Sequence, residues 1–221
     1  REYSILISLS STQRWTYVNR SLSTYLVTQG NRSRGRGTAA VVRAAIAGGV
    51  DAVQLREKHA SASDRYELGQ ELRTMTSEAN IPLLVNDRVD LAAALDADGV
   101  HLGDDDLTVA TAREQLGADV VVGRSVSTAA AARRAEAAGA DYLGVGAVFD
   151  TRTKDTREAE SEIGVETVAA VADAVSVPIV GIGGVTTGNA ERVAAAGADG
   201  VAVVTAITEA DDPAAATRAL R

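Results

Sequence analysis

The sequence has no cysteine, only three prolines, and one each of tryptophan and phenylalanine among its 221 residues. The absence of cysteine excludes disulfides, zinc-thiolate sites and thiol catalysis. Aromatic residues make up 3% of a chain that is 46% hydrophobic, so the core must be built from alanine, valine, leucine and isoleucine. No hydrophobic run approaches the roughly 18–20 residues of a membrane span. We therefore expect a soluble, cytoplasmic protein that folds as one domain.

Lysine is also scarce, because Lys58 and Lys154 are the only lysines among 22 basic residues. Each lies in a short polar motif that follows an expected strand. A lysine ammonium is a compact, mobile charge that suits a phosphate oxygen. Either lysine alone is better read as a solvated surface residue, so the interpretation depends on the residues around them.

The charge is divided unevenly along the chain. Residues 1–36 carry six basic residues and one acid, whereas residues 37–221 carry 16 basic and 29 acidic residues. An acidic body repels nucleic acid, and it repels phosphorylated substrates except where local cations overcome its field. We therefore expect neither a nucleic-acid nor a membrane partner. Residues 1–23 are poor in alanine and include the only tryptophan, so we interpret them as an N-terminal extension to a catalytic domain at 24–221.

From residue 24 onward, short apolar runs alternate with alanine-rich stretches of helical period. The expected strands are Thr24–Thr28, Ala52–Leu55, Pro82–Val85, Gly99–Leu102, Val120–Val122, Tyr142–Val145, Pro178–Val180 and Gly200–Val204. The expected helices lie near 38–47, 62–79, 88–95, 108–115, 128–137, 164–174, 187–195 and 212–220. Continuously apolar strands separated by helices indicate parallel strands that are covered on both faces. Eight such units predict a single (β/α)₈ TIM barrel.

A doubly wound open sheet is the alternative fold, because it also alternates strands and helices. It usually has fewer strands, and the glycine-rich dinucleotide loop expected after its first strand is absent here. A repeated signature supports the barrel. A short segment ending in aspartate precedes the second, fourth, sixth and eighth expected strands, at Asp51, Asp98, Asp141 and Asp199. The same signature at Asp119 precedes the fifth strand, so it marks strand entry in general.

Polar residues gather after nearly every expected strand, where a barrel carries its chemistry. In chain order they are Gln54, Arg56 and Lys58; Asn86 and Asp87; His101 and Asp104–Asp106; Arg124 and Ser125; Thr151–Lys154; and Thr205. Side chains alternate along an extended segment, so Gln54, Arg56 and Lys58 can all face one side. We assign no proton-transfer role to His59 or His101, because the sequence identifies no partner for either.

Two kinds of anion site are predicted at this end of the barrel. The loops 181–184 and 203–207 offer glycine and backbone amides near helix starts, which suits a phosphate monoester. Close packing of a glycine turn is the alternative reading of the first loop. Asp87 and Asp106 suit Mg²⁺, which binds through one or two carboxylates and substrate phosphate oxygens. Asp87 is equally suited to cap the third helix, and Asp104 and Asp105 are expected to be solvated or to cap the fourth.

Positive charge and a hydroxyl around the two carboxylates would accommodate a diphosphate. The candidate residues for this site are Arg56, Lys58, Ser125 and Lys154. Two anion sites in one pocket imply two phosphorylated substrates. The sequence offers no serine–histidine nucleophile system and no paired catalytic carboxylates, so the predicted chemistry is displacement of diphosphate through positioning and leaving-group stabilisation.

The combined motifs resemble the thiamine-phosphate synthase family over the region from about Tyr25 to the C-terminus. They are Gln54–Lys58, Asn86–Asp87, Gly99–Gly103 with Asp106, Gly146 with Thr151–Lys154, Gly181–Gly184 and Val204–Ile207. The resemblance implies a transferase of thiamine biosynthesis. Such an enzyme condenses 4-amino-2-methyl-5-(diphosphooxymethyl)pyrimidine with a thiazole phosphate, giving thiamine phosphate and diphosphate. It also implies that diphosphate departs first and that the thiazole nitrogen attacks the resulting cation.

The resemblance further implies roles for individual residues. Those implied to hold the pyrimidine diphosphate are Gln54, Arg56, Lys58, Asn86, Ser125 and Lys154; those for the thiazole phosphate are Thr151, Thr153, Gly184, Val204 and Thr205; those for Mg²⁺ are Asp87 and Asp106. Among these, Arg56, Lys58, Ser125 and Lys154 are the implied catalytic residues. The chain departs from the family pattern at Asp104–Asp105, where Gln-Glu is common, and at Ser127, Ala147, Asp150 and Thr205.

Two other functions remain open on the sequence. A thiazole tautomerase shares the barrel and the thiazole-phosphate site but needs neither a diphosphate pocket nor magnesium. Asp106, Ser125 and the Thr-x-Thr-Lys segment favour the synthase over it. A non-catalytic sensor of thiamine precursors is opposed only by the completeness of the site. The sequence indicates no oligomeric state.

Overall fold

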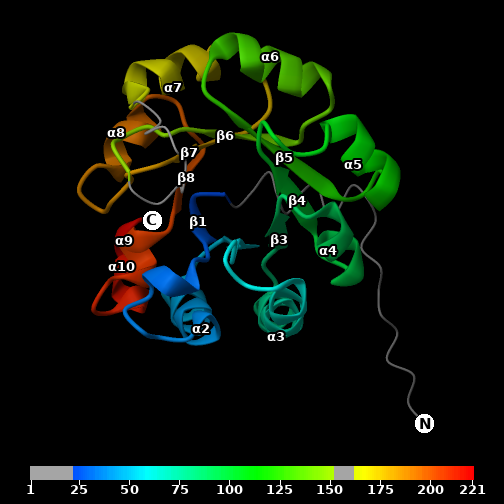
Figure 1. The fold of residues 1–221 in the computed structure, drawn as a ribbon. Helices are drawn as coiled ribbons and strands as arrows, with labels where there is room; N and C mark the ends of the chain where they lie inside the picture. The colour runs from blue at the N-terminus through cyan, green and yellow to red at the C-terminus, as the bar shows by residue number, and fades with distance from the viewer. Residues whose placement is uncertain (1–21, 152–161) are drawn as a thin grey trace.

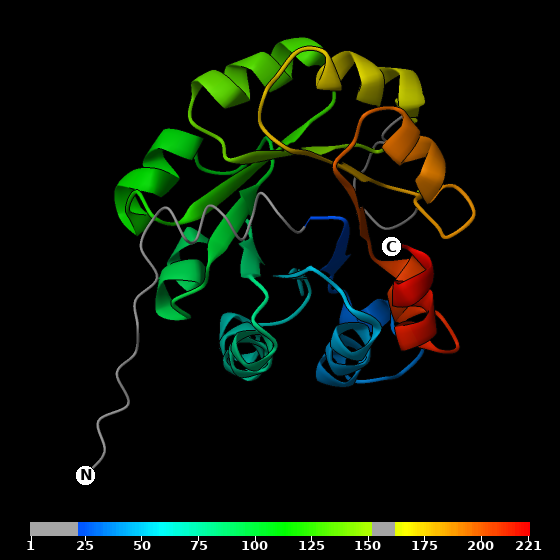
Figure 2. The ribbon, with the colours of Figure 1, turned by 180° about the vertical axis from the view of Figure 1, so that it is seen from behind.

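The computed structural model describes residues 22–151 and 162–221. Within them, eight parallel strands pair in chain order and close into a barrel, because β8 pairs with β1. Figure 1 shows the strands at the centre and the helices around them, and Figure 2 shows the same ring from behind. The predicted (β/α)₈ barrel is therefore confirmed.

The strands and helices follow the predicted alternation closely. The strands are β1 (Thr24–Val27), β2 (Ala52–Leu55), β3 (Leu83–Asn86), β4 (Gly99–Leu102), β5 (Val121–Val126), β6 (Tyr142–Val145), β7 (Ile179–Ile182) and β8 (Gly200–Val203). The helices are η1 (Gly30–Arg32), α2 (Thr38–Gly48), α3 (Ala62–Ala79), α4 (Val89–Ala94), α5 (Val109–Leu116), α6 (Ala129–Ala137), α7 (Gly164–Ala172), α8 (Ala190–Ala195), α9 (Thr205–Thr208) and α10 (Pro213–Ala219). The short η1 and α9 were not expected.

One strand boundary was wrong in a way that matters for the site. We expected the fifth strand to end at Val122, with Arg124 and Ser125 in the following loop. In the structure β5 continues to Val126, which pairs with Val145 of β6. The polar pair belongs to the strand, because it lies in ladder register with β4 and β6. Ser125 is therefore carried by the barrel wall rather than by a loop.

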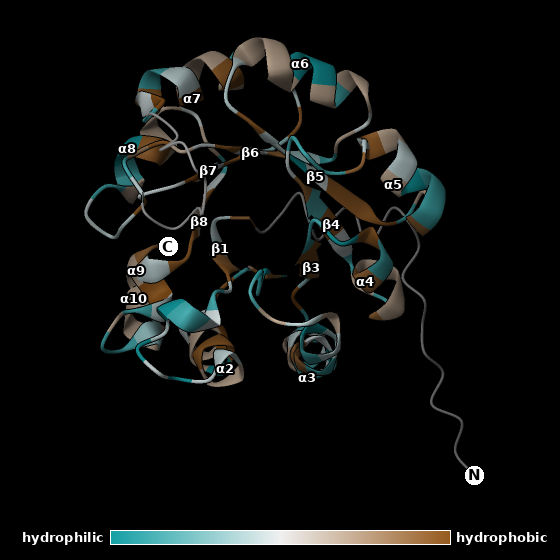
Figure 3. Cartoon of the chain, in the orientation of Figure 1, coloured by the Kyte–Doolittle hydropathy of each residue, from teal (hydrophilic) through white to brown (hydrophobic). Residues whose placement is uncertain are grey.

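The core has two parts, as expected for strands that are covered on both faces. The larger part lies between strands and helices and is built from valine, leucine, isoleucine and alanine. The smaller part comes from alternate strand residues and includes Tyr25, Ala52, Leu84, Tyr142, Val180 and Ala202. In Figure 3 hydrophobic residues run along the strands and alternate with hydrophilic ones on the surrounding helices. Among the described residues, no helix is long and apolar enough to cross a membrane.

The repeated aspartates join neighbouring strands where those strands begin. Asp51, Asp98, Asp141 and Asp199 each accept a hydrogen bond from the backbone N–H of Thr24, Leu83, Val122 or Ile179, respectively, at 2.6–2.9 Å. The backbone N–H of each aspartate in turn donates to the carbonyl of the same partner. Asp119 is exposed, and the structure shows no such bond for it. The signature therefore has a structural role before the even-numbered strands only.

Candidate active site

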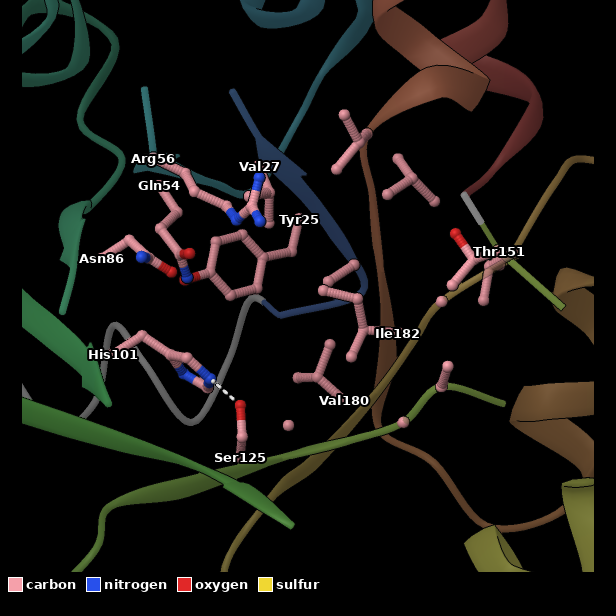
Figure 4. Close-up of a pocket in the computed structure, with 18 of the residues that line it drawn as sticks. Tyr25, Val27, Gln54, Arg56, Asn86, His101, Ser125, Thr151, Val180 and Ile182 are labelled. Carbon is pink, nitrogen blue, oxygen red and sulfur yellow. Dashed lines mark hydrogen bonds between the residues drawn. The ribbon is translucent and has the colours of Figure 1, made fainter. Parts of the chain in front are cut away.

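A pocket of about 850 Å³, counting its open mouth, lies at the carboxyl ends of the barrel strands. Figure 4 shows polar side chains of β2, β3, β4 and β5 on one side of it and the apolar Val180 and Ile182 on the other. Eight of the residues predicted from the sequence line it: Gln54, Arg56, Asn86, Ser125, Thr151, Gly184, Val204 and Thr205. Their roles stay predictions, but the fold does bring them together.

Lys58, Asp87 and Asp106 form a second group that adjoins the pocket beside Asn86. Lys58 Nζ lies 3.0 Å from Asp87 Oδ2. The Asp106 carboxylate accepts a hydrogen bond from the Gly103 N–H at 2.6 Å. Burial raises the pKa of Asp106, and the nearby Asp87 raises it further, while Lys58 and the Gly103 N–H act in the opposite direction. The two carboxylates therefore face each other closely enough to repel.

The Asp87 backbone is itself unusual. Its φ is 63°, in the left-handed region, and its N–H donates to the His101 carbonyl at 2.8 Å. Helix α4 begins after Arg88, which stands at the N-cap without a side-chain cap bond. Asp87 is therefore not the cap of this helix, and its carboxylate is directed to Lys58 instead.

Of the two alternatives for Asp104 and Asp105, the structure confirms solvent exposure and contradicts the cap. Helix α5 is capped by Thr108, whose side chain accepts from the Thr111 N–H, and not by Asp104 or Asp105. Asp104 instead pairs with Arg124 at 3.0 Å. The Arg124 guanidinium also donates to the Gly103 carbonyl. Arg124 thus ties the loop that carries Asp106 to β5.

Arg56 is held on the pocket wall by the neighbouring β1 segment. Its guanidinium donates to Gln29 Oε1 at 3.2 Å, and its backbone N–H donates to Thr28 Oγ1 at 3.1 Å. Glu57, the next residue in this loop, accepts hydrogen bonds from the Gly30 N–H at 2.7 Å and the Thr38 hydroxyl at 3.0 Å. The loop after β2 is therefore anchored on both sides, with Arg56 left facing the pocket.

A chain of hydrogen bonds crosses the pocket floor. Gln54 Nε2 donates to the Tyr25 hydroxyl at 2.7 Å, which lies 3.0 Å from the Tyr142 hydroxyl. Tyr142 in turn lies 2.8 Å from His101 Nδ1, and His101 Nε2 lies 2.9 Å from Ser125 Oγ. Figure 4 shows the last of these contacts as a dashed line. Five side chains from five strands are thereby connected.

Sequence reasoning missed three members of this chain, namely Tyr25, Tyr142 and His101. We expected His101 to be structural, and the structure places it on the pocket floor beside Ser125. Each of the three lies within a strand, so it was read as core or as a strand-end residue. A usable signal was present, because buried tyrosine hydroxyls need partners. Tyr25 and Tyr142 lie within expected strands, and among the described tyrosines they are the buried ones.

The loop after β7 has glycines that the backbone requires. Gly183 and Gly184 have φ values of 96° and 64°. A side chain at Gly184 would come within 2.5 Å of the Asp150 carbonyl. The glycines of this turn are therefore required for close packing, and they also line the pocket. Asn189 fixes it by donating to the Gly184 carbonyl at 3.0 Å.

The expected ligands Thr153 and Lys154 lie outside the described residues. Within the described parts of the chain, no cluster of three or more histidine or acidic side chains gathers to hold a metal. The pair Asp87 and Asp106 is the carboxylate arrangement that adjoins the pocket. Two carboxylates held together at partial burial suit a divalent cation, because it removes the repulsion between them.

Comparison with known proteins identifies the family. The family model described as thiamine monophosphate synthase matches residues 24–207. The chain is 64% identical over 204 residues to a thiamine-phosphate synthase of Haloquadratum walsbyi, covering 92% of each chain. The chain belongs to the thiamine-phosphate synthase family. Members of this family are transferases, so the predicted enzyme class is confirmed.

Other family members show the same likeness. The thiamine-phosphate synthase of Natronomonas pharaonis is 66% identical over 196 residues, covering 89% of this chain and 92% of the relative. A solved thiamine phosphate pyrophosphorylase from Pyrococcus furiosus is 38% identical with a TM-score of 0.84, covering 92% of this chain and 96% of that one. The similarity to thiamine-phosphate synthases thus extends over about nine-tenths of this chain.

Proposed function

We propose that this chain carries out the thiamine-phosphate synthase reaction in the pocket described above, with each anion held by a separate part of the wall. The reaction joins a pyrimidinylmethyl diphosphate to a thiazole phosphate and releases diphosphate. The observation that carries the proposal is convergence: cationic, carboxylate and glycine-loop residues that follow four different strands lie in or beside one pocket.

Arg56, Lys58 and Ser125 are proposed to receive the diphosphate. Arg56 and Ser125 line the pocket, and Lys58 stands beside it. Charged donors aimed at a leaving group act where negative charge develops, which is usually the largest single catalytic effect. The Lys58 side chain is 45% exposed while it contacts Asp87, so its ammonium can reach a phosphate oxygen without rearrangement of a buried group.

Asp87 and Asp106 are proposed to hold Mg²⁺ beside that diphosphate. When bound, the ion supplies charge neutralisation for the diphosphate oxygens. The chain's contribution is to fix the two carboxylates. The Gly103 N–H orients Asp106, and the strained backbone at residue 87 together with Lys58 orients Asp87.

The thiazole phosphate is proposed to bind at the opposite side of the pocket, where Gly184, Val204 and Thr205 present backbone amides and a hydroxyl. An apolar wall that includes Val180 and Ile182 lies across the pocket from Gln54 and Asn86 (Figure 4). It is suited to aromatic rings, and it shields the reacting carbon from water. Proximity of two bound substrates in the right orientation then supplies much of the rate enhancement.

The bond changes require no general base. The methylene C–O bond breaks with its electron pair leaving on diphosphate, and the thiazole nitrogen lone pair forms the new C–N bond. No proton is removed from either substrate. This agrees with the site, where both ring nitrogens of His101 are already engaged by Tyr142 and Ser125.

The direct test is to incubate the purified chain with both substrates and Mg²⁺ and to follow diphosphate. Release that requires both substrates supports the proposal. Conversion of a thiazole phosphate isomer without metal would instead identify a tautomerase, and binding of either substrate without turnover would identify a sensor. Either of these results would overturn the proposed reaction.

A further inference from the structure

The hydrogen-bond chain on the pocket floor has a direction that donor and acceptor counting determines. Gln54 donates an amide N–H to the Tyr25 oxygen. An amide nitrogen cannot accept in return, so the Tyr25 proton must go elsewhere. Among the described residues, the other partner of the Tyr25 hydroxyl is the Tyr142 oxygen. Tyr25 therefore donates to Tyr142.

The same reasoning carries the direction onward. Because the Tyr142 oxygen receives the Tyr25 proton, its own proton is left for His101 Nδ1 at 2.8 Å. That nitrogen must then be an acceptor, which places the ring proton on Nε2. Nε2–H donates to Ser125 Oγ at 2.9 Å. The Ser125 proton is then not needed by the histidine, and the hydroxyl lines the pocket as a donor.

The reverse direction would leave a buried donor without a partner. If Tyr142 donated to Tyr25, the Tyr25 proton would have no acceptor among the described residues. Tyr25 is only 2% exposed and Tyr142 is fully buried. An unsatisfied buried donor costs the full desolvation of that group, on the order of 1–3 kcal/mol. The observed distances therefore favour one direction.

Both phenols keep their protons at neutral pH. Burial raises the pKa of Tyr25 to about 12. Burial also raises the pKa of Tyr142 well above its usual value, and the neighbouring Tyr25 adds to the effect. Neither hydroxyl can thus become an acceptor-only phenolate that would break the chain.

The barrel wall is shaped to admit these rings. A side chain at Gly123 would come within 2.3 Å of the Tyr142 ring, and one at Gly144 within 2.9 Å of the His101 ring. Gly123 lies opposite Tyr142 in the β5–β6 ladder, and Gly144 lies opposite Ser125. Two strand positions thus lack side chains where the rings lie.

We propose that Tyr142 is a positioning residue that holds His101 as the neutral Nε2–H tautomer, so that the Ser125 hydroxyl donates into the pocket. This use of Ser125 rests on the proposed function, in which the hydroxyl meets the departing diphosphate. A diphosphate oxygen is an acceptor only, so a serine that donated to histidine instead would contribute nothing to it. A tyrosine that does not touch the diphosphate would then govern how well it leaves.

The tautomer can be measured without any substrate. The chain has two histidines, so ¹⁵N-histidine labelling gives two ring systems, and a His59→Gln variant assigns them. We expect His101 to show a protonated Nε2 and an unprotonated Nδ1 at neutral pH. An Nδ1–H tautomer or an imidazolium would overturn the proposal. This measurement is independent of whether the chain is a synthase.

Two conservative variants separate positioning from general packing. Tyr25→Phe and Tyr142→Phe each remove one buried hydroxyl. Tyr142→Phe removes the donor to Nδ1, so we expect the single Nε2–H tautomer to be lost. Tyr25→Phe leaves Tyr142 free to donate to Nδ1, so we expect the tautomer to be retained. Equal behaviour of the two variants in the NMR spectrum would contradict the proposed direction.

Kinetics provide the second readout. We expect Tyr142→Phe to lower kcat for diphosphate release by roughly tenfold, the size of one hydrogen bond to a charged group, with KM for the thiazole phosphate unchanged. In a Ser125→Ala background the same substitution should add little, because the tyrosine acts through the serine. Multiplicative effects of the two substitutions would overturn the proposal. If no diphosphate is released by the wild-type chain, the proposed function fails while the tautomer measurement still decides the inference.

Discussion

At the residue scale, the site depends on a few side chains whose neighbours set their charge and direction. Lys58 illustrates this, because it is one of two lysines in the chain and lies 3.0 Å from the proposed ligand Asp87. Asp106 illustrates the converse, because burial and the adjacent carboxylate both raise its pKa. The repulsion between Asp87 and Asp106 is expected to lower the stability of the metal-free protein, and a bound Mg²⁺ is expected to remove it.

The Lys58 ammonium is expected to be needed for turnover. Lys58→Met retains the aliphatic stem but removes the charge, and it leaves Asp87 without its counter-ion. We expect kcat for diphosphate release to fall about 10–100-fold, the range for loss of a hydrogen bond between charged groups. The control is Arg43→Met on the outer face of α2, where the side chain is 72% exposed. Equal rates in wild type and Lys58→Met would refute the role of this lysine.

Asp106→Asn is expected to stabilise the metal-free protein while weakening its affinity for Mg²⁺. Asparagine keeps an oxygen for the Gly103 N–H but relieves the repulsion from Asp87. A raised pKa means that the charged form opposes folding, so the gain is present at pH 7 and vanishes at low pH, where the aspartate is protonated in both states.

The size of this gain is limited by solvent. An exposed charge pair is worth about 0.5 kcal/mol, so a rise in Tm of about 1–2 °C is expected for a domain of this size. Thermal melts at pH 7 and at low pH, with and without Mg²⁺, measure both effects. A lower Tm for the variant at pH 7 without metal would show that the carboxylates do not repel.

At the element scale, the carboxyl ends of the strands carry the site and the amino ends carry the aspartates that join strand pairs. Asp141 is the most enclosed of the paired examples that we describe, with 6% exposure. It accepts from the Val122 N–H at 2.6 Å and from Arg113 at 2.7 Å. The same geometry recurs at four strand pairs within the chain, which indicates a role in stability at this face of the barrel.

Asp141→Ala is expected to destabilise the barrel by about 2–3 kcal/mol, because it leaves a buried N–H and part of a guanidinium without a partner. The corresponding fall in Tm is roughly 5–10 °C. Asp119→Ala is the matched control, since the same sequence signature is solvent-exposed there, and it should change stability by less than about 0.5 kcal/mol. Similar melting temperatures for the two variants would show that the aspartate contacts contribute nothing.

Sequence reasoning predicted the barrel and most strand positions because continuous apolar runs and helical periodicity repeat eight times. It predicted eight pocket-lining residues because polar residues after parallel strands converge on one face. It did not predict the extent of β5, since Arg124 and Ser125 have polar side chains in a strand. It also missed Tyr25, Tyr142 and His101, whose importance comes from side-chain contacts between strands that are far apart in the chain.

At the scale of the whole molecule, the charge is divided between a basic beginning and an acidic body. The domain boundary that we infer from this composition stays a prediction. Leu22, at the start of the described chain, is buried in the smaller core cluster. The Val201 N–H donates to the Ser23 carbonyl. A truncation that tests the boundary must therefore keep these two residues.

Deletion of residues 1–20 is expected to leave both Tm and kcat unchanged within error. The reason is their divergent composition, since they are poor in alanine and contain the only tryptophan. Thermal melts and the diphosphate-release assay on the truncated chain measure both quantities. Loss of folding, or a several-fold loss of activity in a folded protein, would place these residues within the domain.

The central claim is that one end of the barrel gathers two anions, one beside the carboxylate pair and one at the glycine loop. The most direct measurement is a crystal structure of the chain with diphosphate, a thiazole phosphate and Mn²⁺ in place of Mg²⁺, with the metal located by anomalous scattering. We predict that the metal contacts Asp87 and Asp106, that diphosphate lies against Arg56 and Ser125, and that the monophosphate contacts the Gly184 loop. A metal or diphosphate bound elsewhere, with this pocket left empty, would contradict the account.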